Sequence, residues 1–535
     1  MQKLLLGDEA IAQGALDAGL SGAYAYPGTP STEILEYLQH SKEVAERGIH
    51  CTWSANEKTA MEAAIGMSYA GKRTIACMKH VGLNVAADPF INSAITGANG
   101  GLIVVAADDP SMHSSQDEQD SRFYAKFALI PMLEPCDQQE AYEMMHYGFD
   151  LSEKYKIPVM VRITTRLAHS RAGIIQKDVR AQNQKKLPEN PRQFVLLPAI
   201  ARKQYKDLLE KQKHFEAESE KSPFNKYIDG PDKKLGIIAF GLGYNYLIEN
   251  YTDKNIPHPV LKISQYPLPR KMVEKIFNEC DEVLVIEEGQ PIYEELLQGY
   301  LSKNLKVKGR LSGALPRDGE LNPNLVGKAL GFTETKGPEV PSIIVNRPPS
   351  MCNGCPHIDS YNALLEALKG KEQGGVFSDI GCYTLGALPP FNAINSCVDM
   401  GASITMAKGA ADAGFFPAVA VIGDSTFTHS GITSLLDAVV DKAPITVFIL
   451  DNGTTGMTGG QASHAVGRIE AICKGLGVEE EHIRILKPLK NQHSENVKVV
   501  EEELNYRGVS VIIPRRECIQ TLNKKMREKF KNKAK

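Results

Sequence analysis

Short apolar runs, each followed by a glycine- or proline-containing turn and then by an amphipathic stretch, recur along the first 180 residues. Runs of this kind lie in residues 22–34, 74–84, 101–110 and 157–166. Apolar strands that alternate with helical stretches predict a parallel sheet with helices on its faces. Ser31 or Thr32 is expected to cap the helix that follows the first of these strands.

The pattern changes twice further along the chain. Residues 181–234 are charged and turn-rich, which predicts a linker with one solvated surface helix. A second, smaller α/β region begins at Leu235, and a third contains the strand-like runs 420–423 and 447–450. The predicted divisions are 1–180, 181–234, 235–345, 346–518 and a short basic helix or tail at 519–535.

Gly241 and Gly243 follow the first strand of the middle region. A dinucleotide-binding turn would need a third glycine and an acidic residue further on, and both are missing. These glycines are therefore expected to close a tight strand–helix turn.

The composition limits the classes of function. The chain has 535 residues, a formal net charge of −3 and 42% hydrophobic residues, which predicts about two to four domains. The near-neutral charge gives no reason to expect nucleic acid, and no apolar run is long enough to span a membrane. Asp8 and Glu9 interrupt what would be a signal core, and we expect a cytoplasmic protein.

Acidic and amide side chains follow two apolar runs of the third region. Asp424 ends the run in "AVIGDSTFTHSG", and Asn452 follows the run in "VFILDNGTTGMTGGQ". Ligands of open α/β sheets bind beyond the carboxyl ends of the strands, and Mg²⁺ prefers oxygen ligands. Either residue alone fits a helix cap or a turn; together, with the backbone carbonyl of Thr454, they favour a magnesium site.

A glycine turn before a predicted helix adds to this site. Gly401, Ala402 and Ser403 lie in "VDMGASITMAKGAADAG", and backbone N–H groups at such a helix start bind phosphate groups. A diphosphate, Mg²⁺ and an Asp/Asn pair together describe a site for thiamine diphosphate (ThDP).

Longer strings of the sequence are more specific. They are "AYPGTPSTE", "WSANEK", "MKHVGLN", "HSSQDEQDSRFYAKFA", "GCYTLGALPP", "GDSTFTHSG" and "LDNGTTGMTGGQ". Together they resemble the large (alpha) subunit of indolepyruvate:ferredoxin oxidoreductase, in the ThDP-dependent 2-oxoacid:ferredoxin oxidoreductase family. The resemblance extends to about Cys518. It implies two ThDP-binding parallel-sheet domains, pyrimidine-binding first and diphosphate-binding last, with a smaller transketolase C-terminal-like α/β domain between them.

The resemblance also implies a carboxylate that activates the cofactor through N1′ of its aminopyrimidine. Glu57 is the expected residue, at a partly buried helix start where its pKa would be shifted; Glu62, in the helix interior, is the competitor. Thr29 is expected to hydrogen-bond the oxoacid, and Lys79, His80 or His113 could bind its carboxylate or move a proton. Further residues expected beside the cofactor are Tyr26, Pro27, Gly423, Ser425, Gly456 and Met457.

Ten cysteines in a chain of this length do not form a disulfide scaffold. A single C-x-x-C pair, Cys352 and Cys355, fits zinc, a redox pair or no function. The relatives place iron–sulfur ligands at positions matched by this pair, by Cys382 and by Cys518, so the resemblance implies a [4Fe–4S] cluster. The family's usual C-terminal ferredoxin-like module has no counterpart after Cys518, which leaves the exit of the electrons open.

The resemblance implies oxidative decarboxylation of aryl-2-oxoacids such as indolepyruvate. The cosubstrate would be coenzyme A, the electron acceptor ferredoxin, and the partner a small second (beta) subunit in a homo- or heterodimeric assembly. Two alternatives stay open: a non-oxidative ThDP-dependent arylpyruvate decarboxylase, and a subunit that binds ThDP without turnover. The sequence does not identify the 2-oxoacid or assign a role to His357.

Overall fold

The computed structural model describes residues 2–533 except 189, 191, 252–254, 300–305, 334–336, 338, 346–348 and 372–374. The chain forms two compact units, residues 1–339 and 340–535, and each is described by itself. The predicted boundary residue 346 and the last two residues of the predicted tail lie outside the described residues. The division of the chain into five segments stays a prediction.

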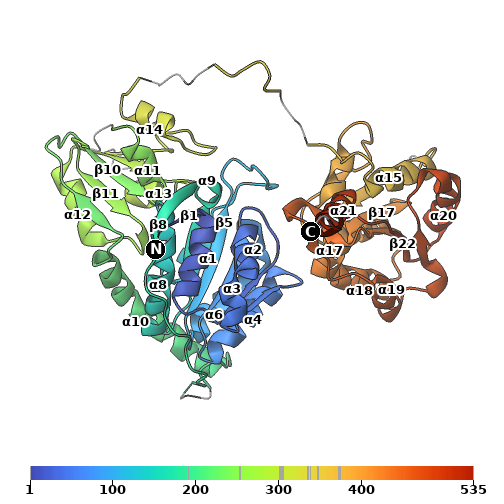
Figure 1. Ribbon diagram of the computed structural model, residues 1–535, viewed down its shortest axis with the longest axis horizontal. Coiled ribbons are helices and arrows are strands. Elements are labelled where there is room, and N and C mark those ends of the chain that lie inside the picture. Colours follow the sequence, from blue (N-terminus) through green and yellow to red (C-terminus); the bar gives the residue numbers. More distant parts are fainter. Residues whose placement is uncertain are drawn as a thin grey trace. The chain divides into compact units, whose positions relative to one another are not determined.

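The first unit contains a seven-stranded sheet in the order β12-β6-β7-β5-β4-β2-β3 (Figure 1). Its strands are β2 (Gly22–Ala25), β3 (His50–Trp53), β4 (Thr74–Lys79), β5 (Leu102–Asp108), β6 (Met132–Leu133), β7 (Val159–Thr164) and β12 (Gln265–Tyr266). Every pair is parallel except β12 with β6. The predicted parallel α/β sheet is confirmed.

Helices cover both faces of this sheet, which explains why its central strands are apolar throughout. Alternate residues enter two cores: Cys77 and Val105 pack with one set of helices, Met78 and Val104 with another. The first set is α1 (Gly7–Asp17), α2 (Thr32–His40) and α8 (Gln138–Tyr155), and the second is α4 (Glu57–Tyr69) and α6 (Ala87–Thr96). Shorter helices at the carboxyl edge and periphery are α3 (Lys42–Glu46), α5 (His80–Val85), α7 (Arg122–Ala128) and α9 (Thr165–His169). A small antiparallel sheet joins β1 (Gln2–Leu6) to β8 (Arg171–Ile175).

A second sheet of the first unit has the order β14-β13-β10-β11-β9. Its strands are β9 (Lys226–Ile228), β10 (Leu235–Phe240), β11 (Val260–Ile263), β13 (Glu282–Ile286) and β14 (Val307–Lys308). Its helices are α11 (Gly243–Ile248), α12 (Arg270–Glu279), α13 (Ile292–Gln298) and α14 (Pro323–Ala329). The predicted linker contains one long helix, α10 (Pro198–Glu220), whose few buried residues include Leu208 and Phe215.

The two sheets of the first unit are joined by backbone as well as by side chains. Strand β12 follows the middle region's β11 in sequence but pairs with β6 of the larger sheet. Gly241, at the turn after β10, has a φ of 45°. A Cβ atom there would lie 2.5 Å from Cγ of Glu134. The turn is therefore tight because it packs against the larger sheet.

Buried ion pairs cross the same junction. Arg122 is fully buried and contacts Asp120 at 2.6 Å and Glu287 at 2.8 Å. Arg162 of β7 pairs within the larger sheet with Asp108, at 2.6 Å, and with Glu134. Its Nη2 crosses the junction and donates to the carbonyl of Glu288 at 3.0 Å. Removing one partner of such a pair leaves a buried charge uncompensated, which costs about 3–5 kcal/mol. The network therefore makes the two sheets dependent on each other.

The second unit has one parallel sheet in the order β16-β15-β17-β18-β22-β21. Its strands are β15 (Gly375–Ser378), β16 (Ser396–Cys397), β17 (Ala418–Gly423), β18 (Ile445–Leu450), β21 (Ile483–Leu486) and β22 (Ser510–Pro514). Its helices are α15 (Pro356–Ala367), α16 (Ala402–Asp412), α17 (Asp424–Thr426), α18 (Ile432–Val440), α19 (Ile469–Gly475), α20 (His493–Asn505) and α21 (Ile519–Lys533). The helices again pack two cores against the two faces of the sheet.

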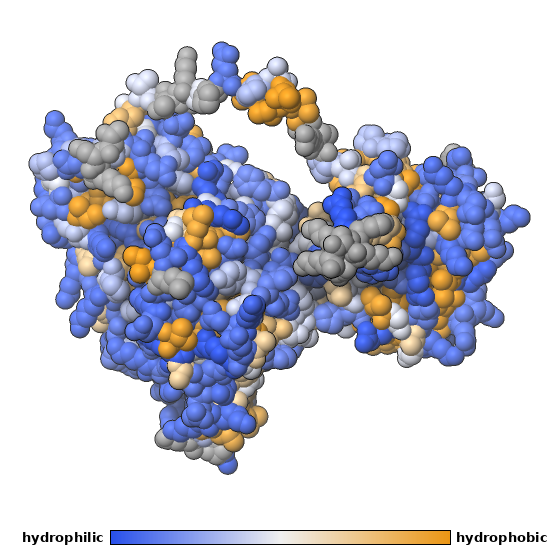
Figure 2. Space-filling view, viewed as in Figure 1, coloured by the Kyte–Doolittle hydropathy of each residue, from blue (hydrophilic) through white to orange (hydrophobic). Residues whose placement is uncertain are grey.

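The surface seen in Figure 2 is mostly hydrophilic, with hydrophobic residues in small separate patches. Among the described residues, no helix has both the length and the apolar character that a membrane crossing requires.

Candidate functional site

The carboxyl ends of β17 and β18 lie side by side in the second unit, with Gly423 paired to Leu450 in parallel register. Asp424 follows β17, and Oδ1 of its carboxylate accepts a hydrogen bond from the N–H of Ser425 at 2.9 Å. Oδ2 accepts one from the N–H of Gly453 at 3.0 Å. The Asp424 carboxylate is therefore tied to the residue next to Asn452.

The environment of Asp424 suits a bound cation. Burial, and then the nearby carboxylate of Asp451, raise the pKa of Asp424 to about 7. A buried acid with a raised pKa lacks a positive partner for its charged form. A divalent cation at this position would supply that charge, so these residues fit Mg²⁺.

The Asn452 side chain is held at both of its polar atoms. Its Nδ2 donates to Nε2 of His357 at 3.2 Å, and its Oδ1 accepts from the N–H of Thr454 at 3.0 Å. Burial, and then the positive charge of Arg516, lower the pKa of His357 to about 4. The imidazole is therefore neutral and able to accept, which fixes the orientation of the amide.

The loop after Asn452 folds back over the strand ends. Strands β19 (Thr454–Thr455) and β20 (Gln461–Ala462) form a short hairpin. Thr455 donates from Oγ1 to Oγ of Ser425 at 2.9 Å, which joins the two predicted cofactor loops. Gly456 and Met457 lie in the turn of this hairpin, and Met457 is exposed.

The glycine turn before α16 has a partner that the sequence did not indicate. Gly401, with a φ of 102°, and Ser403 both donate their backbone N–H groups to the carboxylate of Asp379, and the Ser403 hydroxyl donates to it as well. Burial raises the pKa of Asp379 to about 6. Two of the amides expected to bind a diphosphate thus already contact an internal carboxylate. The carboxylate of Asp379 thus occupies the position at which the sequence predicted the diphosphate.

The four cysteines predicted to hold a cluster come together beside these loops. The thiol of Cys382 has its pKa raised to about 11 by burial and by the thiols of Cys355, Cys518 and Cys352. The N–H of Cys355 donates to the carbonyl of Cys352 at 3.0 Å. A Cβ atom at Gly456 would lie 3.1 Å from Sγ of Cys382. All four cysteines are free of disulfides.

These thiols do not form a closely packed tetrahedral site as they stand. Tetrahedral coordination with Zn–S bonds of about 2.3 Å places sulfur atoms roughly 3.8 Å apart. Over the described part of the chain, no three of these sulfur atoms lie within 4.8 Å of one another. The remaining cysteines are buried or half-buried elsewhere: Cys51, Cys77, Cys136, Cys280, Cys397 and Cys473.

In the first unit, Glu57 is the first residue of α4, capped by Asn56, whose Oδ1 accepts from the N–H of Thr59 at 2.9 Å. The Glu57 side chain is buried and packs against Gly82, where a Cβ atom would lie 2.6 Å from its Oε1. Glu62 instead forms a surface ion pair with Lys58. Of the two acids, Glu57 alone has a protected position.

The loop that carries Tyr26, Pro27 and Thr29 lies at the carboxyl edge of the large sheet. Its turn is closed by Ser31, whose hydroxyl donates to the carbonyl of Gly28 at 2.8 Å rather than capping α2. The Thr29 carbonyl accepts from Oγ of Ser114 at 3.2 Å. Tyr26 is buried.

Lys79, His80 and His113 have different environments. Nζ of Lys79 donates to the carbonyl of Ser114 at 2.8 Å, and burial lowers its pKa. His80 is buried, and its Nε2 lies 3.2 Å from the carbonyl of Asp117. Its Nδ1 has no hydrogen-bond partner within the residues described here. His113 is exposed and lies 3.5 Å from Glu320. Lys79 and His80 thus share the protected edge, and His113 does not.

Three residues beside the strand ends were missed or left without a role by the sequence. Asp379 follows β15, and its only local signal was its position at a strand end. His357 lies two residues after the C-x-x-C pair, which could have suggested a link to the cysteines. Arg516 donates from Nη1 to Asp359 at 2.8 Å and from Nη2 to the carbonyl of Gly354 at 3.2 Å. Burial raises the pKa of Cys355, and the positive charge of Arg516 partly offsets that rise.

Comparisons with known proteins match both units. The family described as "Pyruvate flavodoxin/ferredoxin oxidoreductase, thiamine diP-bdg" matches residues 13–229. The family described as "Thiamine pyrophosphate enzyme, C-terminal TPP binding domain" matches residues 379–512.

Curated relatives cover nearly the whole chain. Indolepyruvate oxidoreductase subunit IorA of Archaeoglobus fulgidus is 40% identical over 96% of this chain and 86% of its own length. The subunit of the same name from Methanothermobacter thermautotrophicus is 39% identical over the same shares. 2-Oxoglutarate synthase subunit KorA of Methanocaldococcus jannaschii is 26% identical over 55% of this chain and 73% of its own length.

A solved structure shares the fold. It is the 2-oxoglutarate:ferredoxin oxidoreductase of Magnetococcus marinus, with a TM-score of 0.51 and 17% identity. The match covers 62% of this chain and 65% of that chain, slightly under two thirds of its length.

Proposed function

Because this chain belongs to the family of indolepyruvate oxidoreductase IorA subunits, we propose that it catalyses the ThDP-dependent oxidative decarboxylation of an aryl-2-oxoacid such as indolepyruvate. The products are CO₂ and an acyl-CoA, and the two electrons pass to ferredoxin. The name of these relatives supports indolepyruvate as the substrate.

One observation carries this proposal. Asn452 lies between the predicted magnesium edge and the predicted cluster ligands and contacts both. Its carbonyl accepts from the N–H of Cys518 at 3.1 Å, and its amide is held by His357, two residues after Cys355. A cofactor that releases electrons and a group that accepts them would therefore be neighbours. A decarboxylase without redox chemistry has no use for this arrangement.

We assign Mg²⁺ to the side chains of Asp424 and Asn452 and the carbonyl of Thr454. The loops with Gly423, Ser425, Gly456 and Met457 would border the diphosphate of ThDP. Gly401, Ala402 and Ser403 remain proposed neighbours of the diphosphate, with Asp379 holding their turn in shape. When bound, ThDP supplies a nucleophilic carbon for the keto group of the substrate.

Glu57 is proposed to hydrogen-bond the aminopyrimidine and to set its protonation. Its buried place against Gly82 keeps water away from the carboxyl group. Tyr26 and Pro27 would line the same pocket. Thr29 would orient the oxoacid. Nδ1 of His80 has no hydrogen-bond partner among the described residues, so it would be available to carry a proton.

We propose a [4Fe–4S] cluster on Cys352, Cys355, Cys382 and Cys518. Their convergence around Cys382 supports one shared metal group. The cluster would accept electrons one at a time and pass them towards ferredoxin. The free state of all ten cysteines supports a reducing compartment, and we place the protein in the cytoplasm.

The reaction is proposed to require the small second subunit, since the relatives are themselves named as subunits. Residues 1–180 would form the pyrimidine-binding domain, 235–345 the transketolase C-terminal-like domain and 346–518 the diphosphate-binding domain. Coenzyme A is proposed as the cosubstrate.

Anaerobic purification with the partner subunit tests the proposal. We expect about four irons and four sulfides per chain, as one cluster requires, together with ThDP and Mg²⁺. Indolepyruvate should reduce ferredoxin only when coenzyme A is present. An iron-free protein that releases an aldehyde would identify the decarboxylase instead. Bound ThDP without turnover of any aryl-2-oxoacid would identify a non-catalytic subunit.

A further inference from the structure

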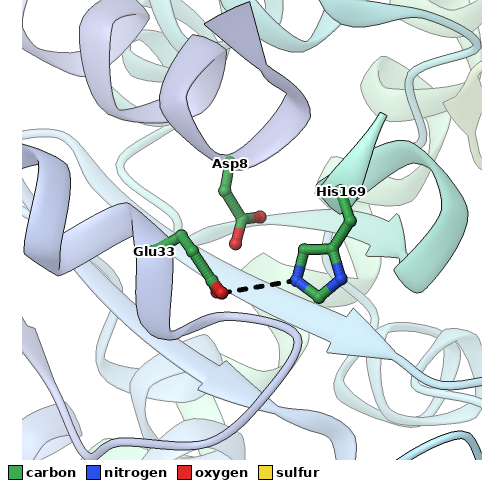
Figure 3. Close-up of side chains that lie close together, drawn as sticks. All are labelled: Asp8, Glu33 and His169. Atoms are coloured by element: carbon green, nitrogen blue, oxygen red, sulfur yellow. Dashed lines mark ion pairs between the residues drawn. The ribbon is translucent and has the colours of Figure 1, made fainter. Parts of the chain in front are cut away.

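Three side chains that the proposed reaction does not use converge in the first unit (Figure 3). Asp8 is the second residue of α1, Glu33 is the second residue of α2, and His169 ends α9. Their possible ligand atoms all lie within 4.8 Å of one another. Oε1 of Glu33 lies 3.6 Å from Nε2 of His169. Residues far apart in the sequence thus present two carboxylates and an imidazole to one point.

Asp8 has no partner for its charge. Its side chain is 0% exposed, and within the described ranges neither carboxylate oxygen has a hydrogen-bond partner. Oε2 of Glu33 is also buried and has no hydrogen-bond partner among these residues. Figure 3 shows the Asp8 carboxylate directed into the space between Glu33 and His169. A buried carboxylate without a donor is strongly disfavoured unless it is paired or coordinates a metal.

The charges around Asp8 increase the need for a positive partner at this point. The carboxylates that act on it most strongly are those of Glu33 and Glu9, and both are negative. Glu9 itself accepts a hydrogen bond from the N–H of Leu6 at 2.8 Å. A protonated His169 would offset one of the two charges of the Asp8–Glu33 pair. A divalent cation would offset both.

We propose that Asp8, Glu33 and His169 bind one divalent transition-metal ion, for which zinc is the best-fitting common ion. Carboxylate oxygens and an imidazole nitrogen are ordinary zinc ligands. Three protein ligands leave the fourth position to water or another small ligand. Glu33 and His169 are each about one-third exposed, which gives the ion a path from solvent.

Such an ion would have a structural effect on the proposed reaction's pocket. It would connect the starts of α1 and α2 to the end of α9. The start of α2 follows directly after the loop that carries Thr29, so the ion would hold one end of that loop. The site is separate from the proposed magnesium ligands, which all lie in the second unit.

The competing explanation is a proton shared between Asp8 and Glu33. Such a proton would satisfy one unpartnered oxygen on each residue and would need no metal. The two explanations differ in zinc binding and in the response of stability to zinc.

The test uses the full-length chain, purified anaerobically with its iron content measured and then saturated with ThDP and Mg²⁺. Zn²⁺ binding is measured by equilibrium dialysis, and the thermal unfolding midpoint is followed in the same samples. The variants are Asp8→Asn, Glu33→Gln and His169→Ala. Glu33 and His169 are partly exposed, so these two variants keep the test open if Asp8→Asn folds poorly.

The wild type should bind one more zinc ion per chain than each variant, and zinc should raise its unfolding midpoint. Each variant should bind zinc at this site at least about 100-fold more weakly, because loss of an outer-shell partner alone costs about 10–100-fold. The matched control is His482→Ala, from the surface group Glu479, Glu481 and His482, where His482 already pairs with Glu503 at 2.8 Å. This control should bind zinc as the wild type does.

Equal zinc binding by the wild type and all three variants would overturn the proposal, as would loss of binding in the control alone. If zinc has no effect on wild-type stability and Asp8→Asn is the more stable protein, the shared proton is correct and the metal site is not.

Discussion

The backbone N–H of Cys518 donates a hydrogen bond of 3.1 Å to the carbonyl of Asn452. One backbone hydrogen bond therefore joins a proposed cluster ligand to a proposed magnesium ligand. The side chain of Asn452 makes a second connection through His357. The metal edge and the cysteines are thus parts of one bonded arrangement.

The His357–Asn452 contact leads to the first prediction. In His357→Ala, the Nδ2 of Asn452 loses its buried acceptor, which costs about 1–2 kcal/mol. We expect Mg²⁺ and ThDP to bind about 5- to 30-fold more weakly, measured by titration calorimetry. The control is His493→Ala, a partly exposed histidine paired with Glu366 at 2.9 Å. Unchanged affinity in His357→Ala would show that the imidazole does not orient the amide.

Magnesium affinity should depend on pH through Asp424. Burial raises the pKa of Asp424 to about 7, and a metal ligand must be deprotonated. Below about pH 7, affinity should fall by up to tenfold per pH unit, and above it affinity should level off. Titrations across this range test the slope. Asp424→Asn should bind Mg²⁺ weakly at every pH. If the Mg²⁺ affinity of this variant still changes with pH, the titrating group is another residue.

The stability of the cofactor-free chain should fall as pH rises, which is opposite to the change in magnesium affinity. The pKa of Asp424 is higher in the folded chain than the roughly 3.9 of the unfolded chain. Its contribution to the free energy of unfolding is therefore fully present below about pH 4 and is lost as pH rises through about 7. Urea denaturation of the wild type and Asp424→Asn at several pH values isolates this contribution.

Substitution of Glu57 should lower the activity, whereas substitution of Glu62 in the same helix should not. Glu57→Gln should lower the rate of substrate-dependent ferredoxin reduction by about 10²–10⁴-fold, the usual contribution of a proton-transfer group, while ThDP still binds. Glu62→Gln is the matched control, because Glu62 lies at the surface and pairs with Lys58. Full activity in Glu57→Gln would contradict the proposed role.

The junction between the sheets of the first unit should respond strongly to substitution. Arg122→Leu removes the ion-pair partner of buried Glu287 and leaves Asp120 with only Arg162, at 3.7 Å. The free energy of unfolding should therefore fall by about 3–5 kcal/mol. Lys308→Ala breaks an exposed pair with Glu282 and should cost less than about 1 kcal/mol. Urea denaturation measures both. A similar small loss in the two variants would mean that the buried network contributes little.

Arg516 should raise the midpoint potential of the proposed cluster. Burial raises the pKa of Cys355, and the positive charge of Arg516 partly offsets that rise. The same charge would favour the reduced, more negative cluster. Arg516→Gln should make the midpoint potential more negative, by tens of millivolts for one charge at an effective dielectric of about 20. A redox titration followed by electron paramagnetic resonance measures the shift. Arg484→Gln, whose partners are Glu502 and Glu503, should leave the potential unchanged.

Local patterns predicted the parts of the site that follow single strands. Apolar runs located the strand ends at Asp424 and Asn452, and the parallel sheet brings those ends together. The four cysteines were matched through the family resemblance, and the structure gathers them. The burial of Glu57 followed from its place at the start of an apolar helix.

Contacts between distant segments were not predictable in this way. Asp379 reaches the amides before α16 from another strand, and nothing in "SDIG" specifies its partner. The pairing of Arg122 with Glu287 spans two sheets, and periodicity carries no information about such a pair. The antiparallel addition of β12 to β6 involves two residues per strand, too few for any periodic pattern.

The placement of β12 has a practical consequence for work with fragments. A cut within residues 181–234 looks natural because that stretch is charged and turn-rich. It would remove β12 from beside β6 and expose that edge of the large sheet to association with other chains. It would also separate Arg122 from its ion-pair partner Glu287. The first 339 residues should therefore be expressed and studied as a single piece.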